Sequence, residues 1–317
     1  MKLLTFIPSG SDASSRFGAA LGDNVIDLSA AHARYGTGGA FPHSLKALIE
    51  SASGLVSAER ALDAAANHAR AGDGVRFQRE HVRLLAPIPN PGKFLCVGAT
   101  GTSRIESLVG NQLSHEIPRE PTGFLKLNSV IVGDEAEIVL PHDITTLDCE
   151  PRLVFIIGKR AFGTRNEDAM RHVMGITLAN DLTAREIEER EIASGTRFWT
   201  ARNMPGFGPV GPFMITLDEV RDPHNLSITC TVNGAVRSRI HTGAFIFRIG
   251  NVIEHFSRWM PLEVGDMIAM GAPVAPRPPS AAPLYLKAGD IIEIAFDGLP
   301  PLRTHVVAPS IAAPSKP

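Results

Sequence analysis

The first part of the chain alternates short apolar runs with turn residues. The segments LLTFI at 3–7 and RFGAALGDNVIDLS at 16–29 follow this pattern, which is typical of a strand meander. Apolar residues then recur at helical spacing in 44–49 and 57–68. The next segment, 85–92, carries three prolines, which remove amide donors and restrict the residues before them. We therefore predict a smaller N-terminal α/β domain at 1–85.

The middle of the chain changes from apolar runs to polar stretches. Residues 153–157 form a continuous apolar run, which predicts a central strand. Capping-box spacing at Thr164/Glu167 and Thr183/Glu186 predicts helices at 165–174 and 184–194. The segment 100–120 is polar and lacks periodicity, which is typical of a loop that closes over a site.

The last third of the chain has the pattern of a β structure. Apolar alternation at 226–232 and 235–241 flanks Asn233-Gly234, a strong hairpin signal. Two segments, 262–268 and 286–292, share the pattern L-x-x-G-D-x-I, in which glycine provides the turn before a strand. We predict an α+β, mainly β fold, with a rolled β domain at 92–310 and a C-terminal tail at 311–317.

Composition narrows the class of partner. A 317-residue chain with 44% hydrophobic residues can bury a full core. A net charge of −2 gives no overall field that attracts nucleic acid or an acidic membrane, and no apolar run approaches the roughly 18 to 20 residues of a spanning helix. Cys96, Cys149 and Cys230 match no zinc or redox spacing. We expect buried free thiols, a cytoplasmic location and a small-molecule partner.

One glycine motif points to a nucleotide but does not fit its context. The segment 206–211 spells G-x-G-x-x-G, yet a dinucleotide site needs a helix whose first amides face the pyrophosphate. Pro209 and Pro212 remove two of those amides, and the segment leads into an apolar run. We interpret it as a glycine-proline turn that enters a sheet.

Three carboxylates are spaced for a common site. Asp148 and Glu150 stand two apart before the predicted strand at 153–157, so their side chains share one face. Asp181 follows 31 positions after Glu150, directly before a predicted helix. A hard divalent cation prefers such oxygen ligands. Alternatively, Asp181 only favours the positive end of the helix, and the other two are solvated.

Several motifs together resemble the fumarylacetoacetate hydrolase (FAH) superfamily. They occur in the family's order and cover about 92–310, with a looser match before residue 85. The motifs are LDCE at 147–150, IIGK at 156–159, NDLTARE at 180–186, GPVGP at 208–212, DPHNL at 222–226, VNG at 232–234, LEVGD at 262–266 and GAP at 271–273.

The resemblance implies a mixed β-roll catalytic domain in a homodimer. It also implies Mg²⁺ or Mn²⁺ held by three carboxylates and bound to a small anionic substrate, a 2-oxo or 1,3-dicarbonyl carboxylate. Reactions in the family include carbon-carbon bond hydrolysis, decarboxylation, hydration and isomerisation. On this basis we expect a hydrolase or lyase that acts on carbon-carbon bonds.

The chain departs from the family at several site positions. Arg152 stands where the second glutamate of E-x-E is expected, and Arg202 where a lysine precedes the G-P-x-G-P turn. In the segment after C-V-G, Arg104 replaces a histidine and Glu106 lies near the position of its partner glutamate. Ala272 replaces the threonine of G-T-P. Arginine stays charged at any working pH and transfers protons poorly.

These departures allow two hypotheses on whether the chain binds the divalent ion that the resemblance implies. Arg152 can replace the ion electrostatically, which keeps a carboxylate-binding site but loses metal-activated water. Alternatively, the ligand set shifts to Asp148, Glu150 and Asp181 and the metal is kept.

The remaining candidates bind or stabilise the substrate. We expect Arg104 to close over the substrate carboxylate, and Arg152, Arg202 and Lys126 to stabilise an oxyanion or enolate. The other expected pocket residues are Phe124, Arg185, Gly271 and Ala272. The alternatives are a metal-free lyase or cyclase, and a non-catalytic ligand-binding pseudoenzyme.

Overall fold

The computed structural model describes residues 1–10, 14–36, 39–70, 72–98, 119–195, 200–271, 284–296 and 299–309. Four of the sequence predictions therefore lie outside the described residues, wholly or in large part. They are Arg104 with Glu106, Ala272, most of the loop at 100–120 and the tail at 311–317.

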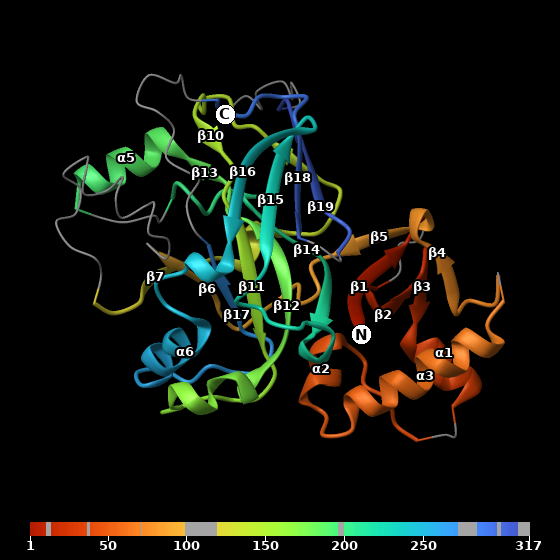
Figure 1. Cartoon of the computed structure of the whole chain (residues 1–317). Helices are drawn as coiled ribbons and strands as arrows, with labels where there is room; N and C mark the ends of the chain where they lie inside the picture. The colour runs from red at the N-terminus through yellow and green to blue at the C-terminus, as the bar shows by residue number, and fades with distance from the viewer. Residues whose placement is uncertain are drawn as a thin grey trace, which may run out of the picture.

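The N-terminal part is the predicted strand meander with helices beside it. Figure 1 shows the three helices packed next to these strands at one end of the molecule. The strands are β1 (Lys2–Pro8), β2 (Arg16–Leu21), β3 (Asn24–Asp27), β4 (Arg76–Gln78) and β5 (Val82–Leu85), and the helices are α1 (Leu28–Tyr35), α2 (Leu45–Glu50) and α3 (Gly54–His68).

These strands continue into one large sheet that runs through the molecule. Its order is β4-β3-β2-β1-β14-β12-β11-β17-β6-β7, with β5 on β1 and β8 on β14. The junction is antiparallel, with Leu3 opposite Met214, so the predicted N-terminal unit shares backbone hydrogen bonds with the rest. The additional strands are β6 (Phe94–Gly98), β7 (Thr122–Lys126), β8 (Ile131–Val132), β11 (Pro151–Ile157), β12 (Val173–Asn180), β14 (Gly208–Thr216) and β17 (Met267–Met270).

A second sheet of five strands has the order β16-β15-β18-β19-β9. Asn233 and Gly234 take positive φ angles of 52° and 77° in the predicted hairpin turn. In both L-x-x-G-D segments the aspartate side chain accepts a backbone N–H from three residues earlier, and a strand follows. The strands are β9 (Ala136–Val139), β15 (Ser227–Val232), β16 (Ala235–His241), β18 (Ile291–Phe296) and β19 (Leu302–Val307).

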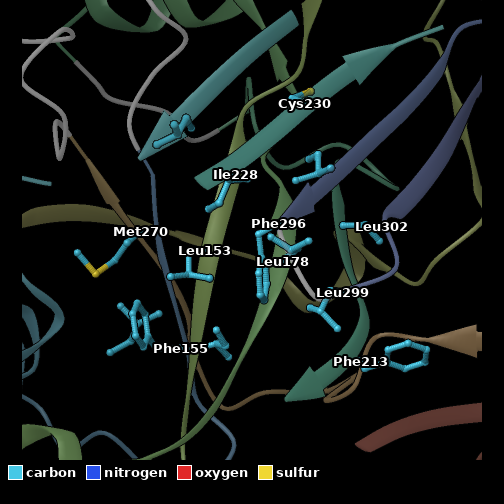
Figure 2. Close-up of a cluster of buried hydrophobic side chains, with 14 of the residues drawn as sticks. Leu153, Phe155, Leu178, Phe213, Ile228, Cys230, Met270, Phe296, Leu299 and Leu302 are labelled. Atoms are coloured by element: carbon cyan, nitrogen blue, oxygen red, sulfur yellow. The ribbon is translucent and has the colours of Figure 1, made fainter. Parts of the chain in front are cut away.

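The main core lies between the two sheets. Along β11, Leu153 and Phe155 belong to the cluster shared with the second sheet, whereas Val154 and Ile156 pack into the cluster shared with the N-terminal part. Figure 2 shows the first cluster, with side chains from β11 and β12 gathered against those from β15, β18 and β19. Burial on both faces explains why residues 153–157 of this strand are all apolar. The α+β, mainly β fold class is confirmed.

The helical predictions are confirmed in part. Helix α5 (Arg185–Ala193) occupies the predicted 184–194 and ends before Gly195. The segment 165–174 was wrongly predicted as an α-helix, because it forms a 3₁₀ turn, η3 (Asn166–His172), and Val173 already begins β12. The elements not yet given are β10 (Leu147–Asp148), β13 (Thr183–Ala184), α6 (Ile249–Ser257), η1 (Arg79–His81), η2 (Asn128–Val130), η4 (Leu217–Glu219) and η5 (Thr242–Ala244).

Two local predictions need correction. Thr183 does not cap α5, because it pairs with Asp148 in the β10-β13 ladder, while Glu186 accepts from the Thr146 hydroxyl. The predicted turn at 206–211 becomes part of a strand from Gly208 onward, where β14 pairs with β12 and β8. Across the described ranges, no helix is both long and apolar enough to cross a membrane.

Candidate active site

The site forms where β11 begins and β12 ends. Pro151 pairs with Asn180, and the Asp181 amide donates to the Glu150 carbonyl at 2.9 Å. The antiparallel register therefore makes Glu150 and Asp181 cross-strand neighbours, and both are buried. Sheet pairing, rather than a helix end, places these two carboxylates together.

Arg152 bridges the two carboxylates. Its Nη2 donates to Oε2 of Glu150 at 2.9 Å and to Oδ2 of Asp181 at 2.8 Å. Its Nη1 donates to the Val97 carbonyl at 2.9 Å. A Cβ on Gly271 would lie 2.7 Å from Cδ of Arg152 and 2.9 Å from the Pro151 carbonyl oxygen. Gly271 thus leaves the space that the buried Arg152 side chain fills.

Arg202 binds the same pair of oxygens from another direction. Its Nη1 donates to Oε2 of Glu150 at 2.8 Å and to Oδ2 of Asp181 at 2.6 Å. Its Nη2 donates to Oε1 of Glu188 at 2.8 Å. The guanidinium carbon lies 5.1 Å from the centre of the Phe124 ring, within cation–π range. The predicted residues Phe124 and Arg202 therefore act as one packed unit.

Lys126 completes the contacts of Asp181. Its Nζ donates to Oδ1 of Asp181 at 2.6 Å and to the Arg202 carbonyl at 2.7 Å. Only 3% of Lys126 is exposed, so it is not the surface lysine that its residue type alone would favour. With Lys126 in place, both oxygens of Asp181 accept from cationic donors.

A second group of charges extends the network toward Asp148. Nη2 of Arg185 donates to Asp148 at 2.9 Å and to Oε1 of Glu150 at 2.7 Å, and its Nη1 donates to Glu188 at 2.7 Å. Arg237 on β16 donates to Oδ1 of Asp148 at 3.0 Å. We call this network the arginine–carboxylate cluster. Its members are Lys126, Asp148, Glu150, Arg152, Asp181, Arg185, Glu188, Arg202 and Arg237.

Sequence reasoning missed two members of the cluster. Glu188 stands three residues after Arg185, and this i,i+3 spacing on one helix is a usable signal for an ion pair. Arg237 has no comparable signal, because its contact with Asp148 spans 89 positions between separate strands. The predicted Arg152, Arg185, Arg202 and Lys126 are all in the cluster.

The contacts set the ionisation states. Burial raises the pKa of Glu150, but the guanidinium groups, led by Arg202 and Arg185, outweigh it and hold the pKa well below the ordinary value. Burial also raises the pKa of Asp181, which Arg202 and Lys126 bring below its ordinary value. For Arg152 and Arg202, burial lowers the pKa and the carboxylates raise it by more. Glu150, Asp181, Arg152 and Arg202 are therefore charged at neutral pH.

The charges do not cancel. The cluster contains five basic and four acidic side chains, which gives a net charge of +1. Six of its members (Lys126, Glu150, Arg152, Asp181, Glu188 and Arg202) are each no more than 6% exposed, and their three positive and three negative charges cancel. The excess charge of +1 comes from Arg185 and Arg237 against Asp148, whose side chains are 8 to 15% exposed, and it favours an anionic ligand.

The donor set does not fit a divalent metal ion. Mg²⁺ binds oxygen at about 2.0 to 2.1 Å in an octahedral shell, whereas Oε2 of Glu150 and Oδ2 of Asp181 each accept from two guanidinium nitrogens. An ion there would add two positive charges to a cluster that already carries +1. Among the described residues, no group of three Asp, Glu, His or Cys side chains is placed to hold a metal.

The alternative metal-ligand set, in which Asp148 joins Glu150 and Asp181, does not come together around one point either. Asp148 accepts from Arg185 and Arg237 and shares no donor with Asp181. It does share Arg185 with Glu150, as expected for two side chains on one face. The predicted metal ligands Asp148, Glu150 and Asp181 are thus salt-bridge partners in this structure.

The three cysteines are free and buried, as expected. Sγ of Cys149 lies 3.7 Å from Sγ of Cys230. Burial, together with the charge of Asp181, raises the pKa of the Cys96 thiol to about 12. A thiol that stays protonated is a poor nucleophile, so Cys96 packs rather than reacts.

Comparisons with known proteins agree with the fold. The family model described as fumarylacetoacetate (FAA) hydrolase C-terminal matches residues 93–307. The chain is 33% identical over 311 residues to the oxaloacetate tautomerase fahd2, mitochondrial, of Xenopus laevis, covering 97% of this chain and 90% of that protein. It is 34% identical over 229 residues to the oxaloacetate tautomerase FAHD2A, mitochondrial, of Homo sapiens, covering 72% and 71%.

Two solved structures share the architecture over nearly the whole chain. Maleylpyruvate hydrolase from Sphingobium sp. SYK-6, in complex with manganese(II) and pyruvate, is 26% identical with a TM-score of 0.72 and covers 97% of this chain and 99% of its own. Fumarylacetoacetate hydrolase from Exiguobacterium antarcticum is 27% identical with a TM-score of 0.72 and covers 98% and 100%.

Proposed function

The chain belongs to the fumarylacetoacetate hydrolase family, and from this membership we propose that it is an enzyme that interconverts the keto and enol forms of a small 2-oxo carboxylate. In this reaction the proton leaves the enol oxygen and a proton is added to the adjacent carbon, so no water or co-reactant is consumed. The names of the Xenopus laevis and Homo sapiens relatives, both oxaloacetate tautomerases, support a tautomerase over the carbon-carbon hydrolase expected from the sequence.

The observation that carries the proposal is that three buried cationic side chains, Lys126, Arg152 and Arg202, all donate to Asp181. A keto-enol conversion passes through an enolate, and preorganised cationic donors stabilise the negative charge that develops on its oxygen. Lys126 at the end of β7, Arg152 in β11 and Arg202 in the turn before β14 supply such donors. In the described part of the chain, Nε of Arg152 is buried and has no hydrogen-bond partner. A substrate oxygen is a suitable acceptor for it.

The cluster holds and stabilises the substrate but does not supply the base. Arginine remains protonated at working pH, and the pKa values of Glu150 and Asp181 lie below their ordinary range. A general base works best with a pKa near the operating pH. Glu106, identified from the sequence, is our candidate for proton transfer.

The absence of an evident base within the described residues favours one second candidate, a ligand-binding pseudoenzyme. In that case the cluster binds the carboxylate of a 2-oxo acid and releases it unchanged. Binding of oxalate with thermal stabilisation, and no turnover of any substrate, is the result that this candidate predicts.

A substrate panel tests the proposal. Purified protein is assayed for loss of enol ultraviolet absorbance with enolic oxaloacetate, for acylpyruvate hydrolysis and for oxaloacetate decarboxylation. We expect saturable acceleration of the first reaction and its loss in Arg202→Met, with Arg171→Ala, which breaks an exposed ion pair, unchanged. Hydrolysis or decarboxylation without tautomerisation would overturn the proposed reaction and leave the anionic substrate class intact.

A further inference from the structure

We infer that Arg152 and Arg202 together take the place of a divalent cation between Glu150 and Asp181, and that Arg152 covers a latent cation site. The two guanidinium groups make four hydrogen bonds to Oε2 of Glu150 and Oδ2 of Asp181, at 2.6 to 2.9 Å. These two oxygens face each other across the strand pair. The inference concerns binding and stability, and it does not depend on which reaction the chain performs.

The charge of the pair equals the charge of the ion. Two guanidinium groups contribute +2 against the two carboxylates, as one Mg²⁺ or Mn²⁺ would. In the family pattern Arg202 stands in place of a lysine of equal charge, and Arg152 stands in place of a glutamate and the ion, which together sum to +1. The electrostatic balance is therefore kept while hydrogen bonds replace metal coordination. Arginine suits this role because its planar fork binds carboxylate oxygens directionally and it is weakly hydrated compared with an ammonium group.

The wild-type cluster excludes an added cation. An ion that reaches these two oxygens must displace donors from Arg152 and Arg202, which are both nearly fully buried. The displaced guanidinium groups would remain close to the ion without carboxylate partners. Buried charges without partners are strongly destabilising, so the wild-type protein is expected to bind no ion here.

The contacts of Arg152 define what its removal would uncover. The guanidinium group donates to three oxygens, which are the Val97 carbonyl, Oε2 of Glu150 and Oδ2 of Asp181. Carbonyl and carboxylate oxygens are the ligands that hard divalent cations prefer. Truncation of Arg152 to alanine leaves these three acceptors around the volume that the side chain filled, and it changes the charge of the cluster from +1 to zero.

The test uses Mn²⁺ alone and measures binding and melting temperature, without an activity assay. We compare wild type, Arg152→Ala, Arg152→Ala/Asp181→Asn and the control Arg171→Ala. We expect Arg152→Ala to melt below wild type, to bind about one Mn²⁺ per chain and to gain several degrees at about 100-fold excess over its Kd. Wild type and Arg171→Ala should not respond, and the added Asp181→Asn should abolish the response.

Two results would overturn the inference. One is stoichiometric binding of Mn²⁺ by the wild-type protein with a rise in its melting temperature. The other is a folded Arg152→Ala protein with no Mn²⁺ response. If Arg152→Ala does not fold, Arg152→Glu is used instead, because it adds a carboxylate to the site. This variant is refolded with and without Mn²⁺. If no folded or metal-bound protein is recovered in Mn²⁺, that result also contradicts a latent site.

Discussion

Nη2 of Arg152 lies 2.8 Å from Oδ2 of Asp181, although the two residues stand on different strands. Asp181 matches a family position associated with metal binding, and here it accepts hydrogen bonds from cationic side chains at both of its oxygens. This relationship turns a predicted metal ligand into the centre of a buried salt-bridge network. The predictions below follow from that change.

Removal of one buried cation should be strongly destabilising. We expect Arg152→Met to lower the free energy of unfolding by about 3 to 5 kcal/mol, because it leaves Glu150 and Asp181 undercompensated in a buried position. Urea denaturation measures the change. Arg171→Ala, which removes an ion pair at the surface, is the control and should differ little from wild type. An Arg152→Met protein as stable as wild type would argue against the network.

Gly271 should be intolerant of a single added methyl group. Its Cβ would meet Cδ of Arg152 at 2.7 Å and the Pro151 carbonyl at 2.9 Å, and overpacking of this kind costs about 1 to 3 kcal/mol. Gly98→Ala is a matched control, because its added Cβ would have its nearest neighbour at 3.8 Å. Equal melting temperatures for the two variants would show that Arg152 does not need the space.

The stability of the protein should fall in acid through Glu150. Its pKa is lowered in the folded state, so its contribution is complete above the pKa of an unfolded glutamate, about 4.3, and is lost as the pH falls through the lower folded value. Glu150→Gln should therefore be less stable than wild type at neutral pH, and the difference should shrink below about pH 4. Denaturation curves at several pH values test this, and a difference independent of pH would contradict it.

Lys126 should contribute to the reaction as well as to the fold. If its ammonium group helps to stabilise an enolate oxygen, Lys126→Met should lower kcat/KM for enolic oxaloacetate by about 10² to 10³-fold, and Lys126→Arg should recover part of the loss. Lys93→Met removes a partly exposed lysine that binds Asp266 and serves as the comparison. Unchanged kinetics in a folded Lys126→Met protein would remove Lys126 from the site.

Much of the fold follows from local sequence signals. The Asn233-Gly234 hairpin and the two L-x-x-G-D turns form as predicted, because each depends on backbone conformations that glycine or asparagine adopts easily. The continuous apolar run in β11 likewise follows from burial on both of its faces. The 3₁₀ turn at Asn166–His172 could not be predicted, because its length is limited by the position at which β12 begins.

The site could be predicted only as a set of residue types. Motif order identified Glu150, Arg152, Asp181 and Arg202, but not that two arginines share one pair of carboxylate oxygens. That geometry depends on the register of β11 against β12 and on the approach of a segment 52 positions away from Glu150. The pairing of Arg237 with Asp148 depends in the same way on how the five-stranded sheet packs against the β10-β13 pair.

The most direct test of this account is the rate of enolic oxaloacetate tautomerisation by wild-type protein after exhaustive dialysis against a chelator, repeated with added Mn²⁺. We expect a saturable acceleration in the chelated protein that Mn²⁺ does not increase. Activity that disappears with the chelator and returns with stoichiometric Mn²⁺ would contradict it.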